Sequence, residues 1–497
     1  MITIRLFLII GLNLLLWQPA SSQDSPQVVR LTLDDAIQMA REQSYDALIA
    51  VHRFRGSYWE YRTYVANLRP NLSISTDLLN YRNSINKIPT IEGDRFFFQD
   101  QNNSGVSLNL NQSVPLTGGN FFVQSNLERI DDFLADPGQQ IDYSTTPISI
   151  GYQQPLFSFN SLKWEKRIEP VRYERARKQL IEDLENVSIK ALNFFFDLAS
   201  SKINLEIAKL NYNNNDTLFK IAEGRFNIGT IAKNELLQME LNYLNSQSEL
   251  KQALLDMEIK ELQMLAFLGF NQNVRLELVI PNETPQASIN YEDALRYAKL
   301  NNQQMLIQQQ QLLEADREIE RARTQSRFQA NLFTSYGLSD RGPVLNQVYN
   351  DLDNSLVISV GVSAPILDWG KGRGLVKVAE STREVVETSV RQNQLEFEQD
   401  VYLKVREFNI QEDQFKIATK ADTIALFKYE VTKQRFLIGK IDVIELNIAL
   451  TEKDQKRRAY ISALRNYWLN YYNIRRLTHY DFVSRKTIDT DYESLMN

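Results

Sequence analysis

The sequence predicts a mixed α and β membrane protein in which a transmembrane β-barrel is continued by a long α-helical coiled-coil barrel. It also predicts that the chain consists of two internal structural repeats. Three observations lead to this fold class. The segment Arg225-Phe226-Asn227-Ile228-Gly229 recurs as Arg435-Phe436-Leu437-Ile438-Gly439, which is 210 residues later (435 minus 225). Unusually long helical patterns flank both copies, and short alternating runs precede each of them.

The N-terminal segment, residues 1–22, has the pattern of a secretory signal peptide. Arg5 supplies a positive charge, residues 6–17 are apolar, and small residues lead up to Ser22, after which we expect cleavage. The alternative is a membrane anchor, but the apolar run is short beside the ~20 residues of a spanning helix. The chain has no cysteine, and therefore neither disulfides nor a thiol for lipidation.

Composition excludes several classes of function. Of the 497 residues, 43% are hydrophobic and 24% charged, and the formal net charge is −6, so we do not expect nucleic acid as a partner. With only His52, His479 and no cysteine, we expect no metal site, no cofactor and no enzymatic activity. The glycine-rich run 370–374 lacks the ending of a phosphate-binding loop, so a flexible corner is the favoured interpretation.

The first repeat, residues 23–270, is expected to hold a helix, four strands and a long helical hairpin. The helix starts near Leu31, with acidic residues in its first turn, and ends near Asn67. The polar segment 80–104 is expected to be a loop. Alternating apolar and polar residues predict the four strands at 72–75, 106–111, 121–127 and 148–152.

The long hairpin follows the fourth strand. Its first helix has apolar residues at alternating spacings of four and three, the seam of a coiled coil. These residues are Leu180, Leu184, Val187, Ala191, Phe194 and Leu198. If residues 166–229 form one helix, it is about 96 Å long, at 1.5 Å per residue. The return helix is expected to run from Ile231 to about Leu268.

A linker at 271–288 precedes the second repeat, residues 289–480. This repeat is expected to contain a helix starting near Tyr291, strands at 332–338 and 356–363, and a second long hairpin. The first repeat therefore has four candidate strands and the second has two. The C-terminal tail, residues 481–497, is polar and is expected to be loose.

The strand lengths suit a membrane-spanning barrel, whose strands have one face toward lipid and the other toward a lumen. Neither repeat has enough strands to close a barrel, and open sheet edges are not tolerated in lipid, so several copies must join to close it. Helices near 100 Å do not fit within a ~30 Å hydrocarbon core, so we expect them to project into aqueous space.

The order of these parts resembles the TolC-like family of outer-membrane efflux proteins. The resemblance covers about Leu31 to Tyr480 and rests on the two corners, 154–157 and 364–370, and on the two hinges. It implies a homotrimer in the outer membrane of a Gram-negative bacterium, in contact with lipid and with a periplasmic helical extension. It further implies passive conduction outward, within a tripartite efflux or type I secretion system that includes a periplasmic membrane-fusion adaptor and an inner-membrane pump.

The resemblance also implies functional residues. In the family the hinges form the adaptor-docking tip, which corresponds here to Arg225, Phe226, Ile228, Gly229, Arg435, Phe436, Ile438 and Gly439. Acidic residues ring the lumen near the tip in the family, and the matching positions are Glu235 and Glu445. One turn further, where a second acid often stands in the family, this chain has Gln238 and Ile448, so it departs from the pattern of a double acidic ring.

Two alternatives remain open at this stage. The additional hairpin in the first repeat predicts a trimeric barrel of 18 strands if it joins the wall, against the 12 strands usual in the family. The alternative function is a non-channel periplasmic coiled-coil adaptor or scaffold, although an adaptor would have one helical hairpin flanked by β-rich domains.

Overall fold

The structure is a computed structural model that describes residues 27–90, 93–134, 140–270, 274–281, 284, 285 and 287–496. The expected signal peptide, residues 1–22, lies outside this part of the chain. The chain forms two compact units. We call them the helical unit (Met1–Ile49, Leu184–Ala287 and Arg406–Asn473) and the sheet unit (Ala50–Asp183, Ser288–Val405 and Ile474–Asn497).

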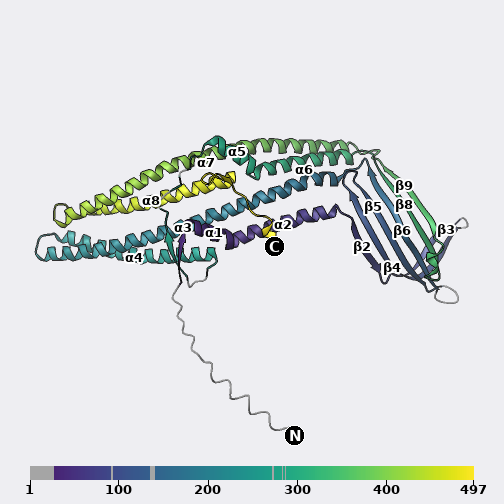
Figure 1. Ribbon diagram of the computed structural model, residues 1–497, viewed down its shortest axis with the longest axis horizontal. Coiled ribbons are helices and arrows are strands. Elements are labelled where there is room, and N and C mark those ends of the chain that lie inside the picture. The colour runs from purple at the N-terminus through teal and green to yellow at the C-terminus, as the bar shows by residue number, and fades with distance from the viewer. Residues whose placement is uncertain are drawn as a thin grey trace, which may run out of the picture. The chain divides into compact units, whose positions relative to one another are not determined.

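The chain contains two long helical hairpins (Figure 1), of which residues 184–268 and 406–473 belong to the helical unit. In the first hairpin, α3 (Ser161–Asn227, 67 residues) is followed by α4 (Lys233–Leu268, 36 residues). In the second, α7 (Lys371–Leu437, 67 residues) is followed by α8 (Val443–Thr478, 36 residues). Every boundary of the second hairpin therefore lies 210 residues after its counterpart in the first (371 minus 161). Among the described residues, no helix is both long enough and apolar enough to span a membrane.

Each repeat begins with two shorter helices. They are α1 (Leu33–Gln43) and α2 (Tyr45–Asn67) in the first repeat, and α5 (Tyr291–Asn301) and α6 (Gln304–Gln325) in the second. The sequence predicted one continuous helix over 31–67, and the structure divides it at Ser44. The Ser44 hydroxyl accepts a hydrogen bond from the Ala47 backbone N–H (3.2 Å), which caps a new helix there.

The sheet unit contains an antiparallel sheet whose strand order is β2-β4-β5-β6-β8-β9. The strands are β2 (Asn71–Asp77), β4 (Gly93–Val114), β5 (Gly119–Asp132), β6 (Gln140–Leu156), β8 (Gln329–Gly342) and β9 (Asp353–Ser363). A strand lies at each of the six expected positions. The sheet is open, with β2 and β9 at its edges, and does not close on itself within the described chain.

The expected loop at 80–104 was a wrong prediction. This segment contains β3 (Tyr81–Thr90), which pairs with the first half of β4 from Tyr81↔Asn102 to Thr90↔Gly93. The described side chains of this ribbon are mostly exposed on both faces. Neither face of β3 is consistently apolar, so its sequence has no clean alternation to reveal the strand.

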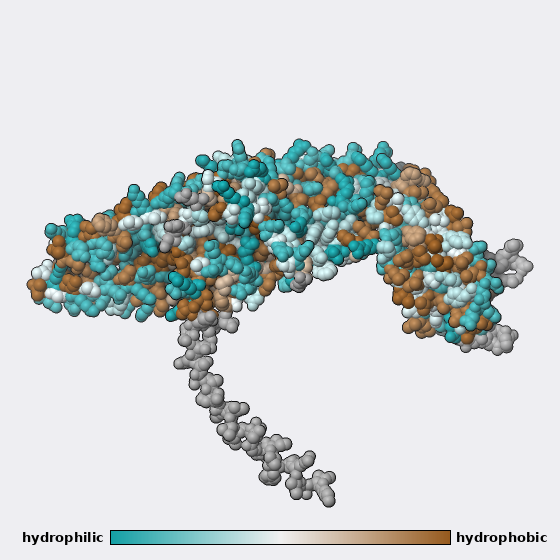
Figure 2. All heavy atoms as spheres, viewed as in Figure 1, coloured by the Kyte–Doolittle hydropathy of each residue, from teal (hydrophilic) through white to brown (hydrophobic). Residues whose placement is uncertain are grey.

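The two faces of the main sheet differ in chemistry. The register places Leu110, Val123, Ile150, Tyr336 and Leu356 side by side on one face, here called the apolar face. At the edges the side chains on this face are solvent-exposed, for example Ile74 (72%) on β2 and Ile358 (66%) on β9. Figure 2 shows apolar residues gathered over the sheet. The other face, here called the polar face, has mainly serine, asparagine, glutamine and glycine.

The expected linker contributes a strand to the helical unit. There, β1 (Gln27–Thr32) pairs in parallel with β7 (Val274–Val279). Glu261 of α4 accepts a hydrogen bond from the Leu276 backbone N–H (2.9 Å), and the Lys202 ammonium of α3 donates to the Leu276 carbonyl. Burial lowers the pKa of Lys202, although Glu261 opposes that shift.

The C-terminal tail is packed, contrary to the expectation that it is loose. It contains β10 (Tyr480–Asp481), β11 (Lys486–Thr487) and the short 3₁₀ helix η2 (Ser494–Met496). The ring of Tyr492 lies 5.4 Å from that of Phe54, and the Arg177 guanidinium lies 4.2 Å from the Tyr492 ring centroid. The polar composition of the tail concealed these aromatic contacts.

Candidate docking tip and channel-forming surfaces

Both hinges have the same hydrogen-bonded turn. In the first, the Gly229 N–H donates to the Phe226 carbonyl and the Thr230 N–H to the Arg225 carbonyl, each at 2.9 Å. The second hinge repeats both bonds from Gly439 and Lys440. This is the Schellman motif, which requires a left-handed residue just past the helix end. Gly229 (φ 76°) and Gly439 (φ 74°) supply it.

The core next to the hinges draws on all four long helices. Its buried residues are Ala222, Met239, Tyr429, Phe436, Leu446 and Ala449. Phe436 is therefore a core residue, with 6% of its surface exposed, whereas its counterpart Phe226 is 36% exposed. The Arg225 guanidinium lies 5.8 Å from the centroid of the Phe436 ring, so these two predicted residues meet inside the tip.

The other predicted tip residues lie on the surface. Ile228 is 75% exposed and Ile438 is 67% exposed, and Arg435 is also exposed. Burying either isoleucine under a partner would be worth about 1.5–3 kcal/mol. The tip therefore has two exposed apolar side chains, one on each hinge.

Glu235 and Glu445 are the third residues of α4 and α8, and both are exposed. The Glu445 N–H donates to the Asp442 carboxylate (2.9 Å), a side-chain cap that α4 lacks because Ala232 occupies the matching position. A groove of about 800 Å³ lies beside the start of both helices, and Glu235, but not Glu445, lines it. The two glutamates, which match in sequence, therefore have different surroundings.

Side-chain contacts give the order of the four helices along the hairpins. Asn211 of α3 donates to Asp454 of α8 (2.7 Å), and Lys428 of α7 pairs with Glu452 of α8 (2.6 Å). Because α4 is joined to α3 by the first hinge, the order away from the hinges is α4-α3-α8-α7, while next to the hinges α3 also contacts α7 through the guanidinium–ring contact described above. The edge helices are α4 and α7.

Both edge helices have an unpartnered apolar stripe that the sequence analysis missed. On α7 it consists of Ile410, Ile417, Ile424, Val431 and Ile438, with exposed fractions of 44–67%. On α4 it consists of Leu237, Leu241, Leu244, Leu255 and Leu262, with exposed fractions of 50–52%. The seven-residue spacing on α7 was visible in the sequence. It ran beside the buried stripe of the same helix, and spacing alone does not tell which stripe is covered.

The glycine-rich corner before α7 does not have the free N–H groups of a phosphate site. Asp368 accepts hydrogen bonds from the backbone N–H groups of Gly370 and Gly372, both at 2.9 Å. These bonds, first that of Gly372, lower the pKa of the Asp368 carboxyl. A protein carboxylate thus occupies the position that an anion would take at this helix start.

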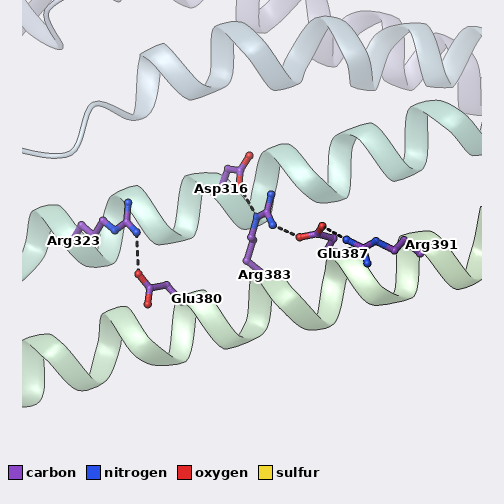
Figure 3. Close-up of polar contacts among 6 residues, drawn as sticks. All are labelled: Asp316, Arg323, Glu380, Arg383, Glu387 and Arg391. Carbon is purple, nitrogen blue, oxygen red and sulfur yellow. Dashed lines mark hydrogen bonds and ion pairs between the residues drawn. The ribbon is translucent and has the colours of Figure 1, made fainter.

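An ion-pair network joins α6 to α7 in the sheet unit (Figure 3). Arg383 of α7 pairs with Asp316 of α6 (3.2 Å) and with Glu387, which also pairs with Arg391 (2.7 Å). Arg391, and then Arg383, lower the pKa of Glu387. The network is exposed, so its contribution is modest and falls with salt. Among the described residues, no group of three or more His, Cys, Asp or Glu could hold a metal ion.

An open sheet with one apolar face and two duplicated long helical hairpins are the features that the sequence analysis expected of an outer-membrane channel with a helical extension. Residues 294–478 match the family described as outer membrane efflux protein. This match supports the recognition made from the sequence. No curated protein sequence matches the chain.

Solved structures share the fold over nearly the whole chain. The CmeC outer membrane channel of Campylobacter jejuni is 13% identical, with a TM-score of 0.65, covering 93% of this chain and 88% of that one. The outer membrane protein VceC of Vibrio cholerae is 12% identical, with a TM-score of 0.63, covering 90% of this chain and 96% of that one. At such low identity, the likeness shows the fold alone.

Proposed function

We propose that the protein is the outer-membrane channel component of a tripartite efflux or type I secretion system. It conducts substrates passively across the periplasm and the outer membrane. The observation that carries this proposal is the sheet, which has exposed aliphatic residues on one face and small polar residues on the other. Such a sheet is stable where lipid covers the first face and water the second. The family match of the second repeat supports the same function.

Three copies would close the barrel. The edge strands β2 and β9 run in opposite directions in the six-strand order, so β9 of one copy would pair with β2 of the next as an antiparallel ladder. β5 lies within the sheet, between β4 and β6, rather than outside it. This arrangement favours 18 strands over 12, because each copy contributes six.

The helical hairpins of the three copies would also join into a closed ring. The stripe of α7 in one copy would pack against the stripe of α4 in the next, giving a ring in which every long helix has two neighbours. The stripe of α7 is apolar at every seventh residue, and that of α4 follows a coiled-coil seam that is apolar except at Ser248, Lys251 and Glu258. Without such a partner, two apolar stripes would remain exposed to water.

The proposed docking surface for the adaptor consists of Ile228, Ile438, Phe226 and Arg435. The glycines 229 and 439 shape the turns that present them, while Arg225 and Phe436 join the two hairpins from within. Through the adaptor, the channel would receive substrate from the inner-membrane pump. The carboxylates of Glu235 and Glu445 are candidates for an acidic gate in the lumen, and no enzymatic step or cofactor is involved.

The proposal is tested with the mature protein purified from outer membranes and inserted into planar bilayers. We expect a detergent-extracted trimer that gives discrete, cation-conducting single-channel steps. A protein recovered from the periplasm without detergent, giving no conductance, would indicate the alternative adaptor or scaffold function and overturn the proposal.

A further inference from the structure

The polar face of the sheet has one aromatic feature that barrel formation does not explain. Phe122 of β5 and Phe333 of β8 lie on this face, because the register pairs Phe122 with Asn111 and Gly151, and Phe333 with Gln153 and Ser359. Their rings stack, with centroids 5.8 Å apart and planes inclined by 20°. Because β6 lies between their strands, the two backbone positions are two strand spacings apart, roughly 10 Å.

Gly151 of β6 makes this contact possible. A Cβ atom built at Gly151 would collide with the outer end of the Phe122 ring, so this end of the ring occupies the space above the glycine. A side chain at this position would lift the ring away from the sheet and from Phe333. Glycine inside a strand weakens it, which makes its presence here informative.

We propose that the Phe122–Phe333 pair is a contact site in the channel lumen for planar aromatic cargo. This inference rests on the proposed function, which makes the polar face the wall of the lumen. Both rings are partly exposed, so they offer π-surface to a passing molecule. A planar aromatic gains stacking energy there that a non-aromatic molecule does not.

The neighbours of the two rings indicate what the site selects. The residues paired with them are Asn111, Gly151, Gln153 and Ser359, and none is charged. The site would therefore discriminate by shape and aromatic character rather than by charge. In a trimer it would occur three times at one level of the wall, so cargo would meet it from any side.

The test measures current blockade in planar bilayers by two cations of equal charge. The planar probe is 9-aminoacridine, and the non-aromatic probe is tetraethylammonium. For Phe122→Ala and Phe333→Ala we expect block by 9-aminoacridine to weaken roughly 2- to 10-fold, the range of aromatic pair energies. Block by tetraethylammonium should not change.

Two further variants control the experiment. Phe121→Ala removes a ring from the neighbouring position of β5, which lies on the apolar face, and should leave both blocks as in the wild type. Phe122→Leu keeps the bulk of the side chain without the aromatic ring, and should weaken block like Phe122→Ala if stacking is the cause.

The outcomes separate the two proposals. Wild-type protein that forms no channels overturns the proposed function. Channels in which Phe122→Leu and Phe333→Ala are blocked by 9-aminoacridine as strongly as the wild type overturn the aromatic site alone. Equal weakening by Phe121→Ala would also overturn it, because the effect would not then depend on the face of the sheet.

Discussion

Replacing the exposed stripe of α7 is the sharpest test of how copies of this chain associate. The double variant Ile417→Asn/Ile424→Asn changes two side chains that are 67% and 58% exposed in the single chain. If the neighbouring copy buries these side chains, each substitution removes roughly two-thirds of the 1.5–3 kcal/mol that burying an isoleucine is worth, or about 1–2 kcal/mol of association free energy. Each interface would lose about 2–4 kcal/mol, and a trimer has three such interfaces.

The assay is the oligomeric mass of the detergent-extracted protein, measured by light scattering, together with its resistance to heat on gels. We expect the double variant to dissociate at lower temperature and at higher protein concentration than the wild type. Leu210→Asn is the matched control, because Leu210 is 51% exposed on α3, which is not an edge helix. It should leave the oligomer intact.

One result would refute the reasoning. A double variant with the mass and heat resistance of the wild type would show that the stripe of α7 is not covered by another copy. Circular dichroism of both variants separates this result from a general loss of folding, since the substituted residues contribute little to the core of the single chain.

Four further predictions concern the hinges, the gate and the buried histidine. Gly439→Ala should destabilise the tip by about 1–2 kcal/mol in thermal unfolding, because φ is 74° and no neighbour would contact the added Cβ. Asp442→Ala should cost about 1 kcal/mol by the same measurement, because it removes the cap from the Glu445 N–H. Glu445→Gln should reduce cation preference in single-channel recordings, and an unchanged preference would reject its role in the gate. Burial, and then Lys178, lower the pKa of His479 to about 4, from an ordinary value of 6.5. Between these two values the unfolded chain binds a proton that the folded chain does not, so stability should fall as pH decreases from 6.5 toward 4, by at most about 1.4 kcal/mol per pH unit. His479→Phe should remove that part of the pH dependence of the melting temperature.

Sequence reasoning located the long helices and the hinges because their signals are local and repeated. A heptad seam persists over many turns, and the Arg-Phe-x-Ile-Gly segment marks the same left-handed helix end in both repeats. The six strands of the main sheet were also found, since one apolar face and one polar face impose a period of two. Strand β3 was missed because neither of its faces is consistently apolar.

The surroundings of the predicted site residues were harder to predict than the helices and strands, because they depend on three-dimensional packing. Phe226 and Phe436 occupy matching positions in the two hinges, yet only Phe436 lies in the core. Likewise Glu235 lines the groove and Glu445 does not. Duplication in sequence predicts equal local structure, but burial depends on which neighbours the other repeat supplies.

The amino-acid sequence by itself determined the elements of this protein: helix lengths, hinges, strand alternation and the absence of cysteine. Only the tertiary structure decided which apolar stripe of α7 is covered, where the edges of the sheet lie, and that Phe122 and Phe333 meet across Gly151. The physical reason is that periodicity encodes which residues share a face, whereas the partner of that face is set by contacts between segments far apart in the chain.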